Sequence, residues 1–122
     1  MKILVCGSRL WTLRAPIERQ LRRLAPGDIV VYGHHWEGAN AIADIIAVEL
    51  GLVVRRYPAN WKKFGRAAGP KRNQEMIDKE HLPKEPIEAC LAFAENFAAA
   101  HGTSDMRRRA FAAGIRVESF ES

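Results

Sequence analysis

The sequence predicts one α/β domain, built on a parallel sheet of about five strands with helices on both faces. Short strand-like runs, the first two of which end at glycine, alternate with helical patterns along the whole chain, which is the pattern of such a sheet. The 122 residues are 48% hydrophobic, enough for one core but not for two, so residues 1–122 are expected to form a single domain. A charged fraction of 27% argues against disorder.

The first half of the chain is expected to hold three strands and two helices. Lys2–Cys6 is a short apolar run ended by glycine, typical of a buried parallel strand. Ala15–Leu24 is predicted to be a helix, because Pro16 suits its first turn and apolar residues recur on one face. The remaining predictions are a strand at Asp28–Tyr32 stopped by Gly33, a helix at Ala39–Leu50 and a strand at Leu52–Tyr57.

A long connection over Pro58–Pro70 opens the second half. Connections of this length are usually functional or disordered, and Trp61 and Phe64 are expected to pack and so to order this one. The elements predicted after it are a helix at Lys71–Lys79, a polar loop at His81–Pro86, a strand at Ile87–Ala94, a loop at Asn96–His101, a helix at Thr103–Ala113 and a strand at Ile115–Phe120.

The charge, the cysteines and the hydropathy limit the partners and the cellular compartment that the sequence predicts. The net charge of +5 suits nucleic acid, free nucleotides or an anionic membrane, although scattered arginines give the same total. Cys6 and Cys90 lack metal-binding or redox spacing and are expected to be core thiols. No apolar run approaches ~18 residues and the chain enters a strand at once, so we expect no membrane span, no signal peptide and a cytoplasmic protein. A homo-oligomer stays open.

Two glycine-hydroxyl segments indicate an anion site. Gly7, Ser8 and Arg9 follow the first strand, and Gly102-Thr103-Ser104-Asp105 is interpreted as a turn that opens the last long helix. Glycine lets backbone N–H groups approach a ligand, and hydroxyls and helix N-termini offer donors to a phosphate. With Gly33, these segments are expected at one edge of the sheet, at a topological switch point. The alternative is a pair of ordinary turns. The Gly-x-Gly-x-x-Gly and Walker patterns are absent, which disfavours NAD dehydrogenases and P-loop NTPases.

Three further clusters have two interpretations each. In the Gly33–Gly38 loop, Trp36 or His35 is a candidate to stack on a purine; the alternative is an exposed polar loop. The two adjacent histidines of this loop lack a fixed third ligand, so we expect no metal site there. Arg72 and Asn73 are candidates to hold a phosphate or a base edge; alternatively, Arg72 pairs with a carboxylate and Asn73 caps the backbone. Arg107–Arg109 are more typical of a solvated helix face than of nucleic-acid contact.

Several segments, spread over nearly the whole chain, resemble the motifs of a known family and occur in the same order as in that family. They are Gly7–Arg9 with Trp11, Tyr57–Trp61, Gly65–Met76, Leu91–Phe93, Gly102–Met106 and Ala113–Ile115. Together they resemble the YspA-like, cpYpsA-related branch of the SLOG superfamily, which also includes the DNA-processing protein A and Lonely Guy families. The resemblance implies a Rossmann-like nucleotide-binding domain, in a branch where many members are encoded by phages or mobile elements. It places Gly7, Ser8, Arg9, Arg72, Asn73, Gly102 and Thr103 at ligand-facing positions.

Two departures from the family patterns bear on function. The second loop of the family usually reads Gly-Gly-Ala-x-Gly-Ala-Asp, whereas Asn40 here replaces the acid and the loop gains bulk; Gly33, Trp36, Gly38 and Asn40 are still candidate ligand contacts. Lonely Guy hydrolases carry Gly-Gly-x-Gly-Thr-x-x-Glu, and the glutamate position holds Met106, while Asp105 is expected to point elsewhere on the helix.

Three functions remain as hypotheses. The first and favoured one is a non-catalytic module that senses or sequesters a nucleotide or an ADP-ribose- or NAD-like ligand, with no catalytic residue and no other cofactor. The second is a phosphoribohydrolase of the Lonely Guy type, which the missing glutamate disfavours. The third is a single-stranded DNA-binding protein, which is disfavoured because no surface with interleaved aromatic and basic residues is expected.

Overall fold

The computed structural model describes all residues from 1 to 122, and its centre is a five-stranded sheet in the order β3-β2-β1-β4-β5. Every pair of neighbouring strands is parallel, which confirms the predicted fold class. The strands are β1 (Lys2–Gly7), β2 (Ile29–His34), β3 (Val53–Pro58), β4 (Ala89–Ala94) and β5 (Arg116–Glu121).

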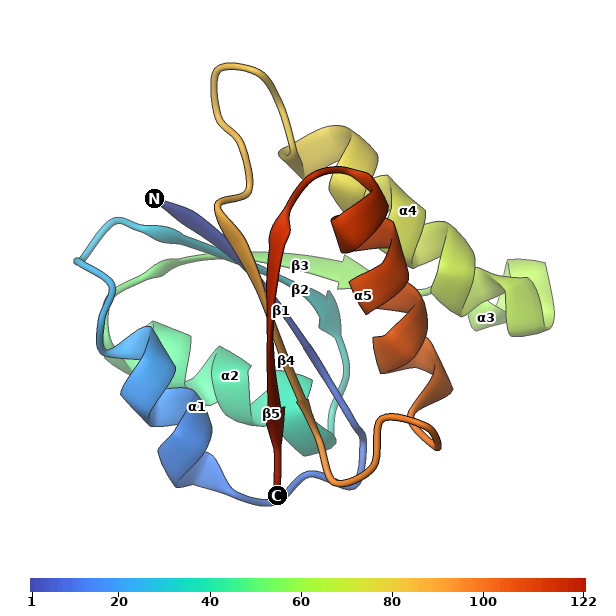
Figure 1. The fold of residues 1–122 in the computed structure, drawn as a ribbon, viewed down its shortest axis with the longest axis horizontal. Coiled ribbons are helices and arrows are strands. Elements are labelled where there is room, and N and C mark those ends of the chain that lie inside the picture. The colour runs from blue at the N-terminus through green and yellow to red at the C-terminus, as the bar shows by residue number, and fades with distance from the viewer.

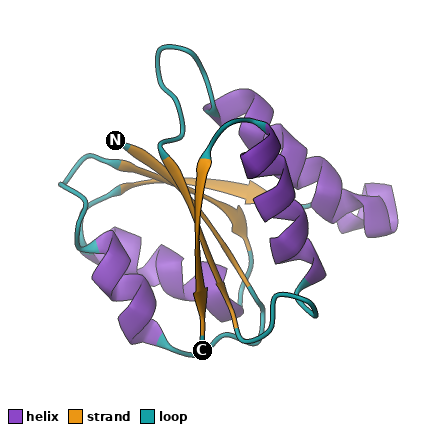
Figure 2. Ribbon diagram, viewed as in Figure 1, coloured by secondary structure: helices purple, strands orange, loops and turns teal.

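Helices cover both faces of the sheet (Figure 1, Figure 2). On one face lie α1 (Arg14–Leu21) and α2 (Gly38–Glu49), and on the other lie α4 (Ala68–Glu80) and α5 (His101–Ala112). A single turn, α3 (Trp61–Phe64), and a 3₁₀ turn, η1 (Gly65–Ala67), connect β3 to α4. None of the helices is both long and apolar enough to cross a membrane.

The predicted strands and helices all form, but several of their boundaries differ. β2 continues through Gly33 to His34 instead of stopping at the glycine. α4 begins at Ala68, three residues before the predicted start, because Pro70 is compatible with a first helical turn. α5 begins at His101, so Gly102 lies inside its first turn and does not form a turn ahead of the helix. α1 ends at Leu21, short of the predicted Leu24.

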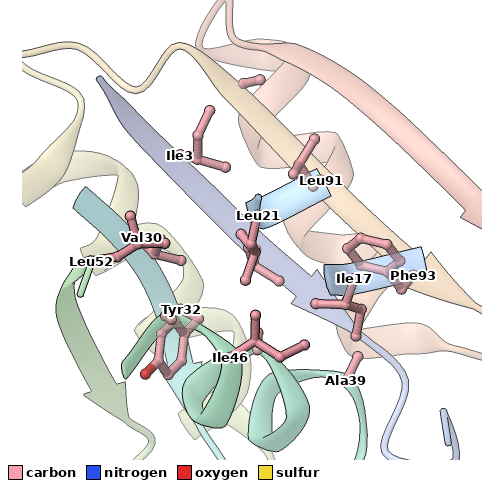
Figure 3. Packing of buried hydrophobic residues seen from close by; sticks show 14 of the residues in the cluster. Ile3, Ile17, Leu21, Val30, Tyr32, Ala39, Ile46, Leu52, Leu91 and Phe93 are labelled. Carbon is pink, nitrogen blue, oxygen red and sulfur yellow. The ribbon is translucent and has the colours of Figure 1, made fainter. Parts of the chain in front are cut away.

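The core has two halves because successive strand residues point to opposite faces of the sheet. Ile3 and Val5 of β1 pack toward α1 and α2, where Figure 3 shows Ile17, Leu21 and Ile46 facing the strands. Leu4 and Cys6 alternate with them and pack toward α4 and α5, against the residues Met76, Ile77, Met106 and Ala110. Cys6 and Cys90 are buried free thiols in this second half, as predicted, with their Sγ atoms 3.8 Å apart.

A buried ion network ties the C-terminal end of α4 to the sheet. The Lys2 side chain is only 1% exposed, and its Nζ lies 3.0 Å from Glu80 Oε1 and 2.6 Å from Glu85 Oε1. Arg55 Nη1 lies 2.7 Å from Glu80 Oε1, and the Tyr57 hydroxyl donates to Glu80 Oε2. Burial alone would raise the pKa of Glu80, but hydrogen bonds from Tyr57, Lys2 and Arg55 outweigh it and the pKa is lowered.

Lys2→Met should destabilise the protein, because it removes one cation from a buried network whose carboxylate stays behind. We expect a loss of about 3 kcal/mol of unfolding free energy at pH 7, measured by urea denaturation. Lys84→Met, in the exposed loop before β4, is the control and should change little because Lys84 makes no ion pair. Equal losses for the two variants would contradict the structural role of Lys2.

The same network predicts how stability responds to acid. Because the pKa of Glu80 is lower in the folded than in the unfolded chain, its contribution is complete above the unfolded value of about 4.3 and is lost as the pH falls below it. Wild-type stability should therefore drop on acidification through this range, and the drop should be shallower in Lys2→Met. Thermal melts between pH 7 and pH 3 measure both slopes; parallel slopes would contradict the assignment.

Candidate functional site

A cavity of about 700 Å³ lies at the carboxyl ends of β1 and β2, next to the N-terminal ends of α4 and α5. After β1 the chain crosses to α1 on one face of the sheet, and after β4 it crosses to α5 on the other face. The cavity is therefore at the topological switch point, where open parallel sheets bind ligands. Most of the predicted site residues line it, namely Gly7, Ser8, Arg9, Gly33, Asn40, Arg72, Asn73, Gly102, Thr103 and Asp105.

Three predicted residues do not line the cavity. Trp36 projects into solvent at 83% exposure, and its ring stacks on His35, the other stacking candidate of this loop, which does line the cavity. The Ser104 hydroxyl donates to Phe97 O at 2.6 Å and so ties the loop before α5 to the helix. Gly38 starts α2 with a φ of +78°, and a β-carbon there would overlap the backbone of Ser8 and Arg9.

Arg72 is a half-buried cation without a carboxylate partner. Its Nη1 donates to Tyr57 O at 3.1 Å and its Nε donates to Asn73 Oδ1 at 3.1 Å. No carboxylate oxygen lies within ion-pair distance, so the interpretation in which Arg72 pairs with an acid is wrong. Burial, and then the nearby charge of Arg9, lower its pKa, which shows that the cation is poorly compensated. Its guanidinium lies over Gly33, where a β-carbon would overlap it.

The N-terminus of α5 offers open donors to the same cavity. The first hydrogen bond of this 12-residue helix runs from Ser104 N–H to Ala100 O at 2.9 Å, and no side chain caps the helix. The N–H groups of His101, Gly102 and Thr103 therefore make no hydrogen bond within the protein, and all three residues line the cavity. Open N–H groups and the helix dipole together favour an anion here.

Asn73 and Asp105 connect α4 to α5 beneath these donors. Asn73 is buried, and its Nδ2 donates to Gly102 O at 3.2 Å and to Asp105 Oδ2 at 3.0 Å, so it does bond to the backbone, as the alternative interpretation had it, but to that of α5. Arg109 Nε donates to Asp105 Oδ2 at 2.8 Å. Burial would raise the pKa of Asp105, but the hydrogen bonds from Arg109 and Asn73 outweigh it and the pKa is lowered. Asp105 is thus a fixed carboxylate that lines the cavity, contrary to the expectation that it points elsewhere.

Asn40 and Ser8 complete the edge formed by β1 and β2. Asn40 Nδ2 donates to Gly33 O at 2.8 Å, whereas its buried Oδ1 accepts no hydrogen bond. An unpaired buried acceptor is costly, and an N–H or O–H group of a ligand would satisfy it. The Ser8 hydroxyl donates to Glu95 Oε2 at 3.1 Å and accepts from Leu10 N–H at 3.0 Å, which fixes the loop after β1.

Sequence reasoning left several cavity residues outside the predicted site. Trp61, which the sequence analysis treated only as a ring that packs and orders the connection, lines the rim, where Arg9 lies 5.6 Å from its ring centroid. Arg66 and Arg108 also line the cavity, and Met106 forms a buried part of its wall at 1% exposure. The three arginines of the run Arg107–Arg109 face different surroundings, since Arg107 lies over the ring of Phe97, Arg109 pairs with Asp105, and only Arg108 lines the cavity. No three His, Cys, Asp or Glu side chains gather in a metal-binding cluster.

The fold and the cavity together define a Rossmann-like α/β protein with a cavity at its switch point whose wall includes Arg72, a cation without an ion pair. Residues 1–64 match the YAcAr family model, the YspA, cpYpsA-related SLOG family, and the chain belongs to this family. The matched part holds β1, β2, β3 and the loop with Ser8 and Arg9, while Arg72 and α5 lie beyond it. No curated protein and no solved structure matches the chain.

Gly38→Ala should destabilise the protein more than the same substitution does at a left-handed glycine with free space around it. Gly114 has a similar φ of +82° but no atom near its missing β-carbon, so Gly114→Ala is a matched control that should lose about 1–2 kcal/mol. At Gly38 the backbone of Ser8 and Arg9 must also move, and we expect a loss of about 3 kcal/mol or more. Urea denaturation measures both losses. Equal values would contradict the close docking of the Ser8–Arg9 loop on α2.

Proposed function

We propose that the cavity binds a nucleotide or a nucleotide-derived ligand of the ADP-ribose or NAD type. The observation that carries this proposal is Arg72, a half-buried cation in the cavity wall with no carboxylate partner. A ligand phosphate would supply the missing anion through charge-assisted hydrogen bonds. The open N–H groups of Gly102 and Thr103 would bind the same phosphate or the next one along a diphosphate.

The rest of the cavity suits the other parts of such a ligand. Trp61 on the rim offers an aromatic face to a base, and Asn40 Oδ1 offers an acceptor to a ribose hydroxyl or an amino group. The volume of about 700 Å³ lies within the range of roughly 300–1,000 Å³ that is usual for small-molecule sites. Membership of a SLOG family fits a nucleotide-related role.

The proposed role is to sense or sequester the ligand without turning it over. Cleavage of an N-glycosidic bond needs a carboxylate close to the sugar to stabilise a cation-like transition state. Met106 stands at the position of the Lonely Guy glutamate and carries neither charge nor proton. Asp105 is already engaged by Arg109 and Asn73. The cavity thus has the groups for binding a phosphate but lacks a free carboxylate at the position that the hydrolases use.

Arg72→Ala should weaken ADP-ribose binding by about 10- to 100-fold, the usual worth of a charge-assisted hydrogen bond to phosphate. Isothermal titration calorimetry measures the affinity, and circular dichroism checks that the variant folds. Arg23→Ala is the control, because Arg23 forms no ion pair and bonds only to the nearby Gln20 side chain. Full affinity in a folded Arg72→Ala variant would remove the proposed site, as would an equal loss in Arg23→Ala.

Purified protein should release no free base from AMP or related nucleoside monophosphates over a long incubation. The physical reason is that Met106 cannot stabilise positive charge on the ribose and Asp105 is held in ion pairs. Chromatography of the reaction mixture measures free adenine. Adenine release that disappears in Arg72→Ala would overturn the binding-only role and make Asp105 and Glu37, the cavity carboxylates, the next residues to change.

A further inference from the structure

A second feature lies outside the cavity, on the connection between β3 and α4. We call it the basic aromatic surface and define it as Trp61, Lys62, Lys63, Phe64, Arg66 and Lys71. No residue of α3 or η1 is buried, and Trp61 and Phe64 are 47% and 39% exposed. The two rings are therefore only partly packed: Trp61 lies against Gly69 of α4, and Phe64 lies beside the ammonium groups of Lys63 and Lys71. A one-turn helix that holds two aromatic rings at the surface contributes little to the core, so its side chains are available to a partner.

The excess positive charge of the protein is concentrated on this stretch of chain. No aspartate or glutamate occurs between Glu49 and Glu75. The cations from 62 to 72, namely Lys62, Lys63, Arg66, Lys71 and Arg72, form no ion pair. These five positive charges are equal in number to the net charge of +5, because the remaining lysines and arginines are as many as the aspartates and glutamates. This stretch is therefore a local concentration of unpaired positive charge, while Arg9, Arg19, Arg23, Lys84 and Arg107 are unpaired elsewhere in the chain. Such a concentration favours a polyanionic partner.

Cations and aromatic rings alternate on this surface. Lys63 Nζ and Lys71 Nζ lie 5.1 Å and 5.0 Å from the ring centroid of Phe64, and Arg9 lies 5.6 Å from that of Trp61. This is the interleaved pattern that the sequence analysis expected to be missing. Rings beside cations suit a partner that presents flat bases and phosphates in turn along one chain.

The basic aromatic surface is continuous with the rim of the cavity. Trp61 and Arg66 belong to both, and a β-carbon added to Gly69 of α4 would lie 3.3 Å from the Trp61 ring. The ring therefore lies close against the start of α4 and is held in place there. A chain that crosses the surface at Phe64 would reach the cavity mouth at Trp61.

We propose that the basic aromatic surface binds single-stranded nucleic acid, with bases stacked on Phe64 and Trp61 and phosphates held by Lys62, Lys63 and Lys71. A single strand is required because duplex bases stack on one another and do not offer their faces. An anionic membrane fits less well, because α3 has only four residues and cannot form the long amphipathic helix that lies in a lipid interface. This interaction goes beyond nucleotide binding in the cavity and does not require it, although both proposals use the Trp61 ring; Phe64 belongs to this surface and not to the cavity.

Fluorescence anisotropy with a labelled 12-nucleotide oligothymidine tests the proposal, and an oligouridine of equal length separates DNA from RNA. Phe64→Ala should weaken binding by about 5- to 150-fold, the effect of losing one stacked base, and Phe64→Trp should retain it. Phe111→Ala is the matched control, since Phe111 is a 77% exposed ring on α5, and it should leave the affinity unchanged. Replacing Lys63 and Lys71 together by alanine should reduce the slope of log affinity against log salt by about 1.4.

Three results would overturn the proposal. One is a folded Phe64→Ala variant that binds the oligonucleotide as tightly as wild type does, and another is equal affinity for a duplex of the same length. The third is the absence of oligonucleotide binding together with Phe64-dependent binding to vesicles of phosphatidylserine and phosphatidylcholine, which would identify a membrane as the partner. The cavity is tested separately, because Phe64→Ala should leave the calorimetric affinity for ADP-ribose intact.

Discussion

The position of β1 between β2 and β4 is the constraint on which the rest of the structure depends. Both pairings are parallel, so the chain leaves β1 and β4 at the same edge of the sheet. The connections to β2 and to β5 run in opposite directions across the sheet, and right-handed crossovers in opposite directions lie on opposite faces. The two connections diverge and leave a hollow between them, which the N-terminus of α5 and the loop with Ser8 then line. The location of the cavity is thus a consequence of strand order, and its chemistry comes from the side chains that reach this edge.

α4 contributes the cation Arg72 to the cavity wall, and its C-terminal end is fixed to the sheet. Its C-terminal end is fixed by Glu80, which Lys2 and Arg55 bind from the sheet, and its N-terminal end carries Arg72 and Asn73 to the cavity. Arg72 and Glu80 are eight residues apart in this 13-residue helix, which is about 12 Å at about 1.5 Å per residue. The buried ion network therefore positions Arg72 from the opposite end of the helix, and it does so without giving Arg72 a carboxylate that would compete with a ligand.

The fold was predictable because the strands are short runs, apolar in β1, β2 and β4, and because the strands and helices alternate along the chain. The cavity residues after β1 were predictable for the same reason, since the end of that strand locates Ser8 and Arg9. Trp36 and Trp61 show that the sequence does not predict which loop side chains reach the cavity. Both lie in loops that follow strands, but only tertiary packing of Trp61 on Gly69 brings it to the rim. The unpaired state of Arg72 is equally invisible in sequence, because acids distant in the chain decide it.

The central claim is that the edge formed by β1, β2 and the start of α5 binds a phosphate-bearing ligand, and an ¹⁵N NMR titration with ADP-ribose tests it most directly. The largest saturable shifts should occur at the amides of Gly102 and Thr103 and at the Arg72 side chain. Gly51 and Gly114, which precede β3 and β5 at the opposite edge of the sheet, should not shift. An absence of saturable shifts, or shifts centred on Gly51 and Gly114, would contradict the claim.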